Sequence, residues 1–299
     1  MTTIDSKSLI GRRLAPGESA GAETPARAGS GRAVSPAGHL SEMFCSFQGE
    51  GLFAGERQIF VRTAGCTATC SWCDTVYSKV QTPRFVIHSN AHGEPKPWRP
   101  NPVALDDVLG DVTELARAGG PVATVAITGG EPLEQPEFVA PLARELRARG
   151  FRVYLETAGL RAAALRTVLA DVDVIAADVK LPSATGVEHW DAHREFLGAI
   201  RDSAFDPARA DARSLFVKVI VDLKATVTEI ERAADLVAAL SRKVPFVIQP
   251  ESGTLLGPRT TREDRHALLD LVEAGARAAL LRLDVVRVIP QTHKVLHIR

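Results

Sequence analysis

The alternation of short apolar segments with longer helical patterns constrains the fold more than any other feature of the chain. The apolar segments are brief and rich in β-branched residues, which favours buried strands. We expect strands at Gln58–Arg62, Val122–Thr128, Arg152–Glu156, Asp173–Asp178, Leu215–Val221, Pro245–Gln249 and Leu283–Val288. Helical patterns lie at about 104–118, 137–149, 161–170, 188–202, 226–240 and 261–277. Strand followed by helix, repeated along the chain, predicts an α/β fold of parallel strands with helical crossovers.

A barrel-like sheet and an open sheet both satisfy this alternation. In either, functional residues are expected on the loops that follow the C-terminal ends of the strands. One helix has a clear start, because Thr226 and Glu229 have the spacing of a capping box. An irregular, proline-rich insertion at about residues 78–102 interrupts the alternation.

Composition places the chain among globular proteins. The 299 residues carry 36 basic and 36 acidic side chains, and this balance argues against a broad nucleic-acid surface. Apolar runs are shorter than the roughly 20 residues of a membrane span, and the first residues lack a secretory signal, so we expect a cytoplasmic protein. Residues 1–38 are rich in Ala, Gly, Ser and Pro, which predicts a disordered tail before a folded domain at 39–299.

Three of the four cysteines lie close together in the segment after the first expected strand. Cys66, Cys70 and Cys73 can supply three thiolates from one loop to a [4Fe–4S] cluster, which leaves the fourth iron open to another ligand. Cys45 is set apart in an expected strand, where burial as a small apolar residue is favoured. The spacing therefore indicates a metal site rather than a disulfide scaffold.

Zinc is the competing interpretation of the three cysteines. A structural zinc ion takes four protein ligands, and His88 or His92 could complete the set. Both histidines lie in the proline-rich insertion, where the sequence fixes no register. On this alternative the chain would be a zinc-binding module without catalytic activity.

The cysteine spacing resembles the signature of the radical S-adenosylmethionine (SAM) superfamily. A second segment supports the resemblance, since Thr128-Gly129-Gly130-Glu131-Pro132 ends the next strand, where the superfamily places a similar segment beside the amino group of SAM. The resemblance implies that SAM chelates the open iron and that one electron cleaves it to a 5′-deoxyadenosyl radical. Another radical enzyme, such as a glycyl-radical activase, is the alternative within this superfamily.

Four further segments narrow the resemblance. They are Ser46-Phe47-Gln48-Gly49-Glu50-Gly51, Phe60-Val61-Arg62, Cys73-Asp74-Thr75 and Gln291-Thr292-His293-Lys294. Over about residues 41–299 the chain is similar to the 7-carboxy-7-deazaguanine synthase family. The resemblance implies a partial (β/α)6-type barrel. It also implies an enzyme that contracts the ring of 6-carboxy-5,6,7,8-tetrahydropterin with loss of ammonia and regenerates SAM. It also implies Mg²⁺, a flavodoxin or ferredoxin as electron donor, and a homodimer.

The residue types suit such a substrate. Arg62 has a planar fork that can bind a carboxylate through two hydrogen bonds, and Gln48 and Glu50 can pair with the polar edge of a pterin. The resemblance adds further contacts: Thr128, His293 and the terminal carboxylate of Arg299 to the substrate, and the hydroxyl of Thr75 to Mg²⁺. Mg²⁺ bound to a protein usually keeps several water ligands, so a single hydroxyl ligand from the protein is in line with its coordination chemistry.

The resemblance also implies a set of cofactor contacts. They are Trp72, Cys73, Asp74, Gly130, Asp178, Val179, Lys180, Gln249, Pro250, Glu251 and Ser252. Two segments depart from the family pattern: Asp178-Val179-Lys180 replaces a common Ser-Pro-Lys, and Ala158 replaces the Asn of a Glu-Thr-Asn-Gly turn. The charged run Glu188, His189, Asp191, His193, Arg194 and Glu195 is interpreted as a solvated helix face.

Overall fold

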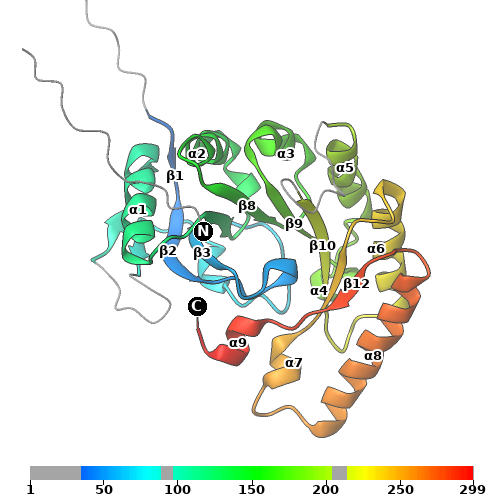
Figure 1. The fold of residues 1–299 in the computed structure, drawn as a ribbon. Helices are drawn as coiled ribbons and strands as arrows, with labels where there is room; N and C mark the ends of the chain where they lie inside the picture. Colours follow the sequence, from blue (N-terminus) through cyan, green and yellow to red (C-terminus); the bar gives the residue numbers. More distant parts are fainter. Residues whose placement is uncertain (1–34, 89–96, 204–213, 299) are drawn as a thin grey trace, which may run out of the picture. The chain divides into compact units, whose positions relative to one another are not determined.

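A 10-stranded sheet forms the centre of the protein, as seen in a computed structural model that describes residues 35–88, 97–203 and 214–298 (Figure 1). Its strand order is β12-β11-β10-β9-β8-β7-β3-β2-β4-β5. These strands are β2 (Leu40–Phe47), β3 (Arg57–Thr63), β4 (Arg84–Ile87), β5 (Arg99–Pro100), β7 (Thr124–Gly129), β8 (Arg152–Thr157), β9 (Val174–Asp178), β10 (Ser214–Val221), β11 (Phe246–Pro250) and β12 (Val286–Val288). The short strands β1 (Ala37–Gly38) and β6 (Val103–Ala104) pair separately.

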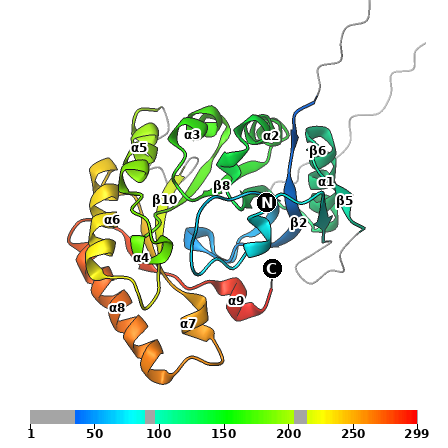
Figure 2. The same cartoon turned by 180° about the vertical axis from the view of Figure 1, so that it is seen from behind.

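The helices connect these strands in the order expected for crossovers. They are α1 (Leu105–Ala118), α2 (Pro136–Ala148), α3 (Ala162–Val168), α4 (Pro182–Thr185), α5 (Trp190–Arg201), α6 (Val227–Leu240), α7 (Ser252–Leu256), α8 (Arg262–Leu280) and α9 (Thr292–Leu296). Figures 1 and 2 show α1, α2, α3, α5, α6 and α8 following one another along one face of the sheet. Within the described residues, no helix is long and apolar enough to cross a membrane.

All pairs from β3 through β7, β8, β9, β10 and β11 to β12 are parallel. The predicted α/β fold of parallel strands with helical crossovers is thereby confirmed, as is each of the expected strands. The capping box is also present, because the Thr226 hydroxyl accepts from the Glu229 N–H and the Glu229 carboxylate accepts from the Thr226 N–H. The antiparallel pairing of β2 with β3 adds a strand that precedes the parallel series.

The two faces of the sheet have separate apolar cores because side chains alternate along each strand. In β3, Ile59 and Val61 pack with the helices in the larger core, whereas Phe60 belongs to a second cluster on the opposite face. Tyr154 and Phe216 extend that second cluster across β8 and β10. The face that carries this second cluster, called the inner face below, has no layer of crossover helices and leads to the functional site.

Three sequence expectations need comment. The tail predicted over 1–38 lies mostly outside the described residues, and its last residues Ala37–Gly38 form β1, where Gly38 packs against Phe138. The insertion at about 78–102 contains β4 and β5 as well as irregular chain. The prediction that His193 lies on a solvated helix face is wrong: its side chain is 1% exposed, because the apolar face of α5 turns it toward the sheet.

Candidate active site

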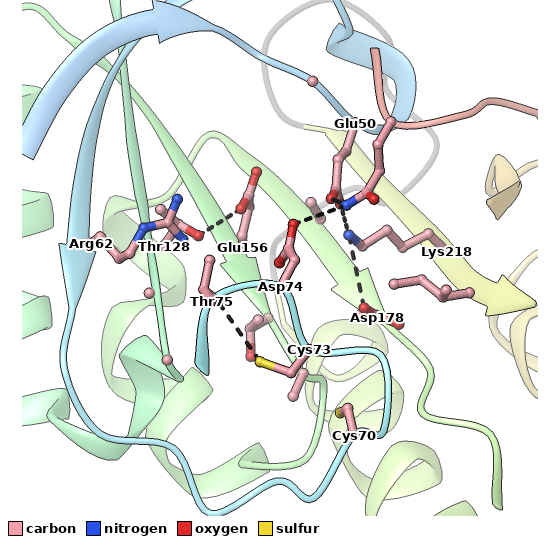
Figure 3. Close-up of a pocket in the computed structure, with 18 of the residues that line it drawn as sticks. Glu50, Arg62, Cys70, Cys73, Asp74, Thr75, Thr128, Glu156, Asp178 and Lys218 are labelled. Atoms are coloured by element: carbon pink, nitrogen blue, oxygen red, sulfur yellow. Dashed lines mark hydrogen bonds and ion pairs between the residues drawn. The ribbon is translucent and has the colours of Figure 1, made fainter. Parts of the chain in front are cut away.

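An open cavity lies at the C-terminal ends of the parallel strands (Figure 3). Five of the polar strand residues that line it form one row across the sheet: Arg62, Thr128, Glu156, Asp178 and Lys218. We call this set the polar belt. Each residue stands two positions after a member of the inner apolar cluster, namely Phe60, Ala126, Tyr154, Ala176 and Phe216. The two-residue period of a strand therefore aims all five side chains at one cavity.

Glu156 lies at the centre of one group of hydrogen bonds in the cavity. Thr128 Oγ1 donates to Glu156 Oε2 over 2.6 Å, and Gln48 Nε2 donates to Glu156 Oε1 over 2.8 Å. Gln48 also donates to Gln58 Oε1 over 3.2 Å and accepts from the Glu50 N–H. Two predicted substrate contacts, Gln48 and Thr128, thus hold a carboxylate that the sequence analysis did not assign to the site.

Arg62 is oriented from behind by a buried carboxylate. Its Nε donates to Glu42 Oε1 over 2.9 Å, and Tyr77 Oη donates to the same oxygen over 2.7 Å. Burial alone would lower the pKa of the Arg62 guanidinium, but Tyr77 and Glu42 outweigh it and raise that pKa. Using Nε for Glu42 leaves the two terminal nitrogens of the fork for a ligand in the cavity.

Glu50 and Lys218 form a buried ion pair on the other side of the cavity. Lys218 Nζ donates to Glu50 Oε2, and Gln291 Nε2 donates to Glu50 Oε1 over 2.6 Å. Burial raises the pKa of Glu50, yet the Lys218 ammonium more than offsets this and the net pKa is lowered. Burial lowers the pKa of Lys218, but Glu50 and Asp178 raise it overall. Both groups are therefore charged.

Asp178 and Lys180 extend this charged group toward the cysteine loop. Lys180 Nζ donates to Asp178 Oδ2 over 2.7 Å and lies 4.6 Å from the centroid of the Trp72 ring. Asp178 Oδ1 and Trp72 Nε1 are buried and have no hydrogen-bond partner among the described residues. Buried polar atoms of this kind normally find a partner, so they mark a place for ligand groups that both donate and accept hydrogen bonds.

The cysteine loop, residues 66–73, is attached to the fold at several places, and at its start Cys66 N donates to Lys79 O over 3.1 Å. On one side Glu134 Oε1 accepts from Thr67 N over 2.9 Å and from Arg161 Nη2 over 2.8 Å. On the other side the loop donates to carbonyl oxygens of α4, through Ser71 N to Ala184 O and Thr69 Oγ1 to Thr185 O. Hydrogen bonds from the backbone and the threonine side chains of the loop thus fix its position.

All three cysteines of the loop line the cavity and are partly exposed. Burial raises the pKa of the Cys66 and Cys70 thiols. Metal binding deprotonates such thiols and draws them together. Among the described residues no fourth protein ligand stands beside the three thiols, and such a set fits a [4Fe–4S] cluster with one open iron better than a closed zinc site.

Gly130 and Glu131 join the cysteine loop to the neighbouring strand ends. A side chain on Gly130 would lie 2.2 Å from Gly65 O, so only glycine permits this approach of the two loops. Glu131 accepts from Thr157 Oγ1 over 2.8 Å and from Ala158 N over 2.6 Å. Its carboxylate therefore fixes the turn after β8 rather than facing the cavity.

The C-terminal segment covers the remaining side of the site. Thr292 N donates to Gly49 O over 2.8 Å, and Lys294 Nζ lies 2.9 Å from Asp74 Oδ2. The His293 ring packs so closely on Gly49 that a Cβ there would lie 1.8 Å from His293 Nδ1. Burial raises the pKa of Asp74, but hydrogen bonds from His293 and Lys294 lower it overall, so Asp74 is ionised.

The structure brings most of the sequence-predicted residues to the cavity. Those that line it are Gln48, Glu50, Arg62, Cys66, Cys70, Trp72, Cys73, Asp74, Thr75, Thr128, Gly130, Asp178, Lys180, Glu251, Ser252 and His293. Val179, Gln249 and Pro250 are buried and do not line it; Val179 belongs to the larger core because it follows Asp178 on the opposite face. Arg299 and His92 lie outside the described residues.

A parallel α/β sheet, with a loop of three cysteines directly after its first parallel strand and a cavity at the strand ends, defines the class of protein. The model of the Radical SAM superfamily matches residues 60–207. A [4Fe–4S] cluster and SAM are the cofactors of that superfamily, and the three thiols and the orphaned polar atoms of Asp178 and Trp72 fit them. The enzyme is thus a radical SAM enzyme.

Sequence relatives define the family more narrowly. The 7-carboxy-7-deazaguanine synthase of Geobacter sulfurreducens is 36% identical over 87% of this chain and 97% of its own length. That of Methanopyrus kandleri is 34% identical over 89% of this chain and 96% of its own length. The crystal structure of QueE from Escherichia coli has a similar fold, with a TM-score of 0.50 and 21% identity over 85% of this chain and 94% of that one. The chain belongs to the 7-carboxy-7-deazaguanine synthase family of lyases, which acts in 7-deazapurine biosynthesis.

Proposed function

We propose that the chain converts 6-carboxy-5,6,7,8-tetrahydropterin to 7-carboxy-7-deazaguanine with release of ammonia. The observation that carries the proposal is the assembly of one cavity from distant segments. Glu50, Arg62 and Gln291 reach it from opposite ends of the sequence, and the cysteine loop opens onto it. This arrangement offers cationic and anionic groups to one ligand beside a cluster site.

The polar belt supplies groups that complement such a pterin. The fork of Arg62 binds the substrate carboxylate, and Glu50 and Glu156 accept from ring and amino N–H groups. Gln48 and Thr128 act mainly by fixing Glu156. His293 and the carboxylate of Arg299 complete the predicted substrate contacts.

The cofactor side of the cavity is assigned to Trp72, Asp74, Gly130, Asp178 and Lys180. Val179, Gln249, Pro250, Glu251 and Ser252 complete the predicted set, and those of them that do not line the cavity would act through their backbone. SAM bound to the cluster would supply a hydrogen-abstracting radical. The chain orients C6 of the pterin toward it and excludes water.

Mg²⁺ is proposed to bind beside the Thr75 hydroxyl. Thr75 precedes the short 3-10 helix Val76–Ser78, but its side chain makes no capping hydrogen bond there. Its Oγ1 is 3.9 Å from Cys73 Sγ, at the edge of the cavity. The hydroxyl is thus placed for a ligand rather than for helix capping, and a magnesium ion there would neutralise substrate carboxylate charge.

Replacing Thr75 with Ala is expected to spare the cluster and to raise the Mg²⁺ concentration needed for half-maximal rate by about tenfold, because one oxygen ligand is lost. Thr167→Ala serves as the control, since Thr167 Oγ1 donates to the Ala164 carbonyl within α3 and Thr167 does not line the cavity. An unchanged Mg²⁺ requirement in Thr75→Ala would remove Thr75 from the proposed site.

Three other properties stay predictions from the sequence and its resemblance. They are a flavodoxin or ferredoxin as the electron donor, a homodimer, and a cytoplasmic location. Gel filtration at several protein concentrations and reduction assays with each donor would test the first two.

An anaerobic assay tests the proposed function. Reconstituted enzyme is mixed with dithionite, SAM, Mg²⁺ and the tetrahydropterin, and the products are identified by mass spectrometry. We expect 7-carboxy-7-deazaguanine, and none when SAM is omitted. Release of 5′-deoxyadenosine without that product would contradict the substrate and retain the enzyme class.

A further inference from the structure

Lys218 is a charged residue in an otherwise apolar strand. β10 reads Ser-Leu-Phe-Val-Lys-Val-Ile-Val, and Lys218 itself is 9% exposed. Burying an ammonium group is costly unless nearby charges and hydrogen bonds compensate it. A buried lysine at the end of the inner face therefore needs a reason beyond packing.

The partners of Lys218 supply the compensation. Its Nζ donates to Glu50 and lies 3.8 Å from Asp178 Oδ2 (Figure 3). Asp178 already has an ammonium partner in Lys180 at 2.7 Å. Glu50 has no second cation among its described partners; its other oxygen accepts from the neutral amide of Gln291. Of the two carboxylates, Glu50 thus depends more on Lys218.

The same contacts fix the direction of the Glu50 carboxylate. Glu50 lies at the N-terminal end of the 3-10 helix Gly51–Phe53, in a loop that belongs to neither strand of the β2–β3 pair. Lys218 holds one carboxylate oxygen from a rigid central strand, and Gln291 holds the other. A loop residue thereby acquires the fixed position of a sheet residue, and the remaining lone pairs of its oxygens stay available for a ligand.

We propose that Lys218 is a positioning residue that holds Glu50 as an oriented carboxylate for the N–H donors of the pterin. This inference rests on the proposed function, since the pterin is its substrate. Lys218 contacts the ligand only through Glu50. Asp178 and Lys180 serve the SAM side of the cavity and keep their own ion pair when Lys218 is removed.

The test is a double-mutant cycle on Lys218→Met and Glu50→Gln. Equilibrium binding of the tetrahydropterin is measured by anaerobic calorimetry on cluster-loaded protein without reductant, so that no turnover occurs. We expect each single variant to weaken binding by about 10- to 100-fold, as for loss of a charged hydrogen bond. Because Lys218 acts through Glu50, the double variant should bind within about twofold of the single Glu50→Gln variant.

Further variants separate positioning from general damage. Lys218→Arg should restore most of the affinity because it keeps a cation in the strand, and the exposed residue Lys224, changed to Met, should leave binding unchanged. SAM affinity should change less than about threefold in Lys218→Met, since Asp178 retains Lys180. The double variant also removes both buried charges, so it stays folded even where Lys218→Met alone does not.

Two results would overturn the inference. Tight pterin binding by Lys218→Met would show that Glu50 needs no support from Lys218. Multiplying losses in the double variant would show that the two residues act independently. Failure of the wild-type chain to bind the pterin would instead contradict the proposed function itself, which separates the two failures.

Discussion

The polar belt and the cysteine loop meet in one cavity but are built in different ways. Belt residues stand in buried strands, four of them in the last two positions of their strands, and Arg62 and Lys218 each pair with a carboxylate. The cysteine loop is attached to its surroundings through Glu134 and α4. The fold thus fixes the substrate side of the cavity through strands and ion pairs, whereas it carries the proposed metal ligands on a single loop.

Replacing one cysteine should abolish the cluster site on the cysteine loop and leave the polar belt intact. We expect Cys66→Ala to lose the cluster and all measurable turnover, since it removes one of the three thiolates that the loop offers to the cluster. The unfolding midpoint should change little, because Cys66 lies in a partly exposed loop. Iron and sulfide analysis with thermal unfolding measures both effects.

Cys45→Ala provides the matched control for this experiment. Cys45 is 2% exposed in β2 and contacts Arg57, away from the loop. Its replacement should retain the cluster and lower stability by about 1 kcal/mol through the lost packing. A Cys66→Ala protein with full cluster content and activity would contradict the radical SAM assignment.

Replacing Arg62 should weaken substrate binding by the polar belt and leave the cluster site on the cysteine loop intact. Arg62→Lys loses the fork and the Nε contact with Glu42, so we expect pterin affinity to fall by about 100-fold at unchanged iron content. The control is Arg152→Lys, because Arg152 is the first residue of β8 and the cavity lies at the other end of that strand. This variant should bind the pterin normally. Equal affinities for Arg62→Lys and wild type would exclude Arg62 as the carboxylate-binding group.

The buried His193 side chain connects the segments that follow β8 and β9, and its protonation should make the stability of the protein depend on pH. Its Nε2 accepts from Lys180 N over 3.0 Å, so Nδ1 donates to Gly159 O over 2.9 Å. Burial lowers the pKa of His193 to about 4, so the unfolded chain binds the proton first as pH falls. Stability that is complete above about pH 6.5 is lost toward pH 4, by about 2 kcal/mol at pH 5.

Urea unfolding at two pH values measures this effect. His193→Gln should be less stable than wild type near neutral pH, yet its unfolding free energy should depend less on pH between about 7.5 and 5. Equal pH dependence in the two proteins would show that His193 is not the acid-sensitive group.

Among the variants compared here, the removal of Glu134, which anchors the cysteine loop, should have the smallest effect. Glu134→Ala removes the acceptor for Thr67 and Arg161, but the pair is partly exposed, with 43% of the Arg161 side chain accessible. We expect a loss of about 0.5–1 kcal/mol and slower cluster reconstitution with unchanged pterin affinity. A change in pterin affinity would contradict the separation of loop and belt.

The sequence predicted the fold and much of the site because both depend on local patterns. Strand periodicity located the parallel strands, the spacing of the cysteines located the cluster site, and the resemblance to the family located Arg62 and Glu50. Glu156 and Lys218 share the belt position two residues after an inner apolar residue, so the same periodicity contained their signal. Without the sheet register, nothing in the sequence separated them from ordinary charges at strand ends.

His193 shows a second limit of sequence reasoning. It recurs with Trp190, Leu197 and Ile200 at helical spacing on the buried face of α5. Its charged neighbours in the sequence favoured a solvated interpretation. Only the packing of α5 against the turn after β8 identifies the acceptor and donor that satisfy a buried imidazole.

Transfer of hydrogen from the substrate tests the central claim most directly, namely that the belt holds C6 of the pterin against the SAM site. The tetrahydropterin is labelled with deuterium at C6 and incubated with the reduced, cluster-loaded enzyme, and SAM is recovered for mass spectrometry. The account predicts deuterium in the adenosyl group of SAM. Formation of 7-carboxy-7-deazaguanine with no deuterium in that group would contradict it.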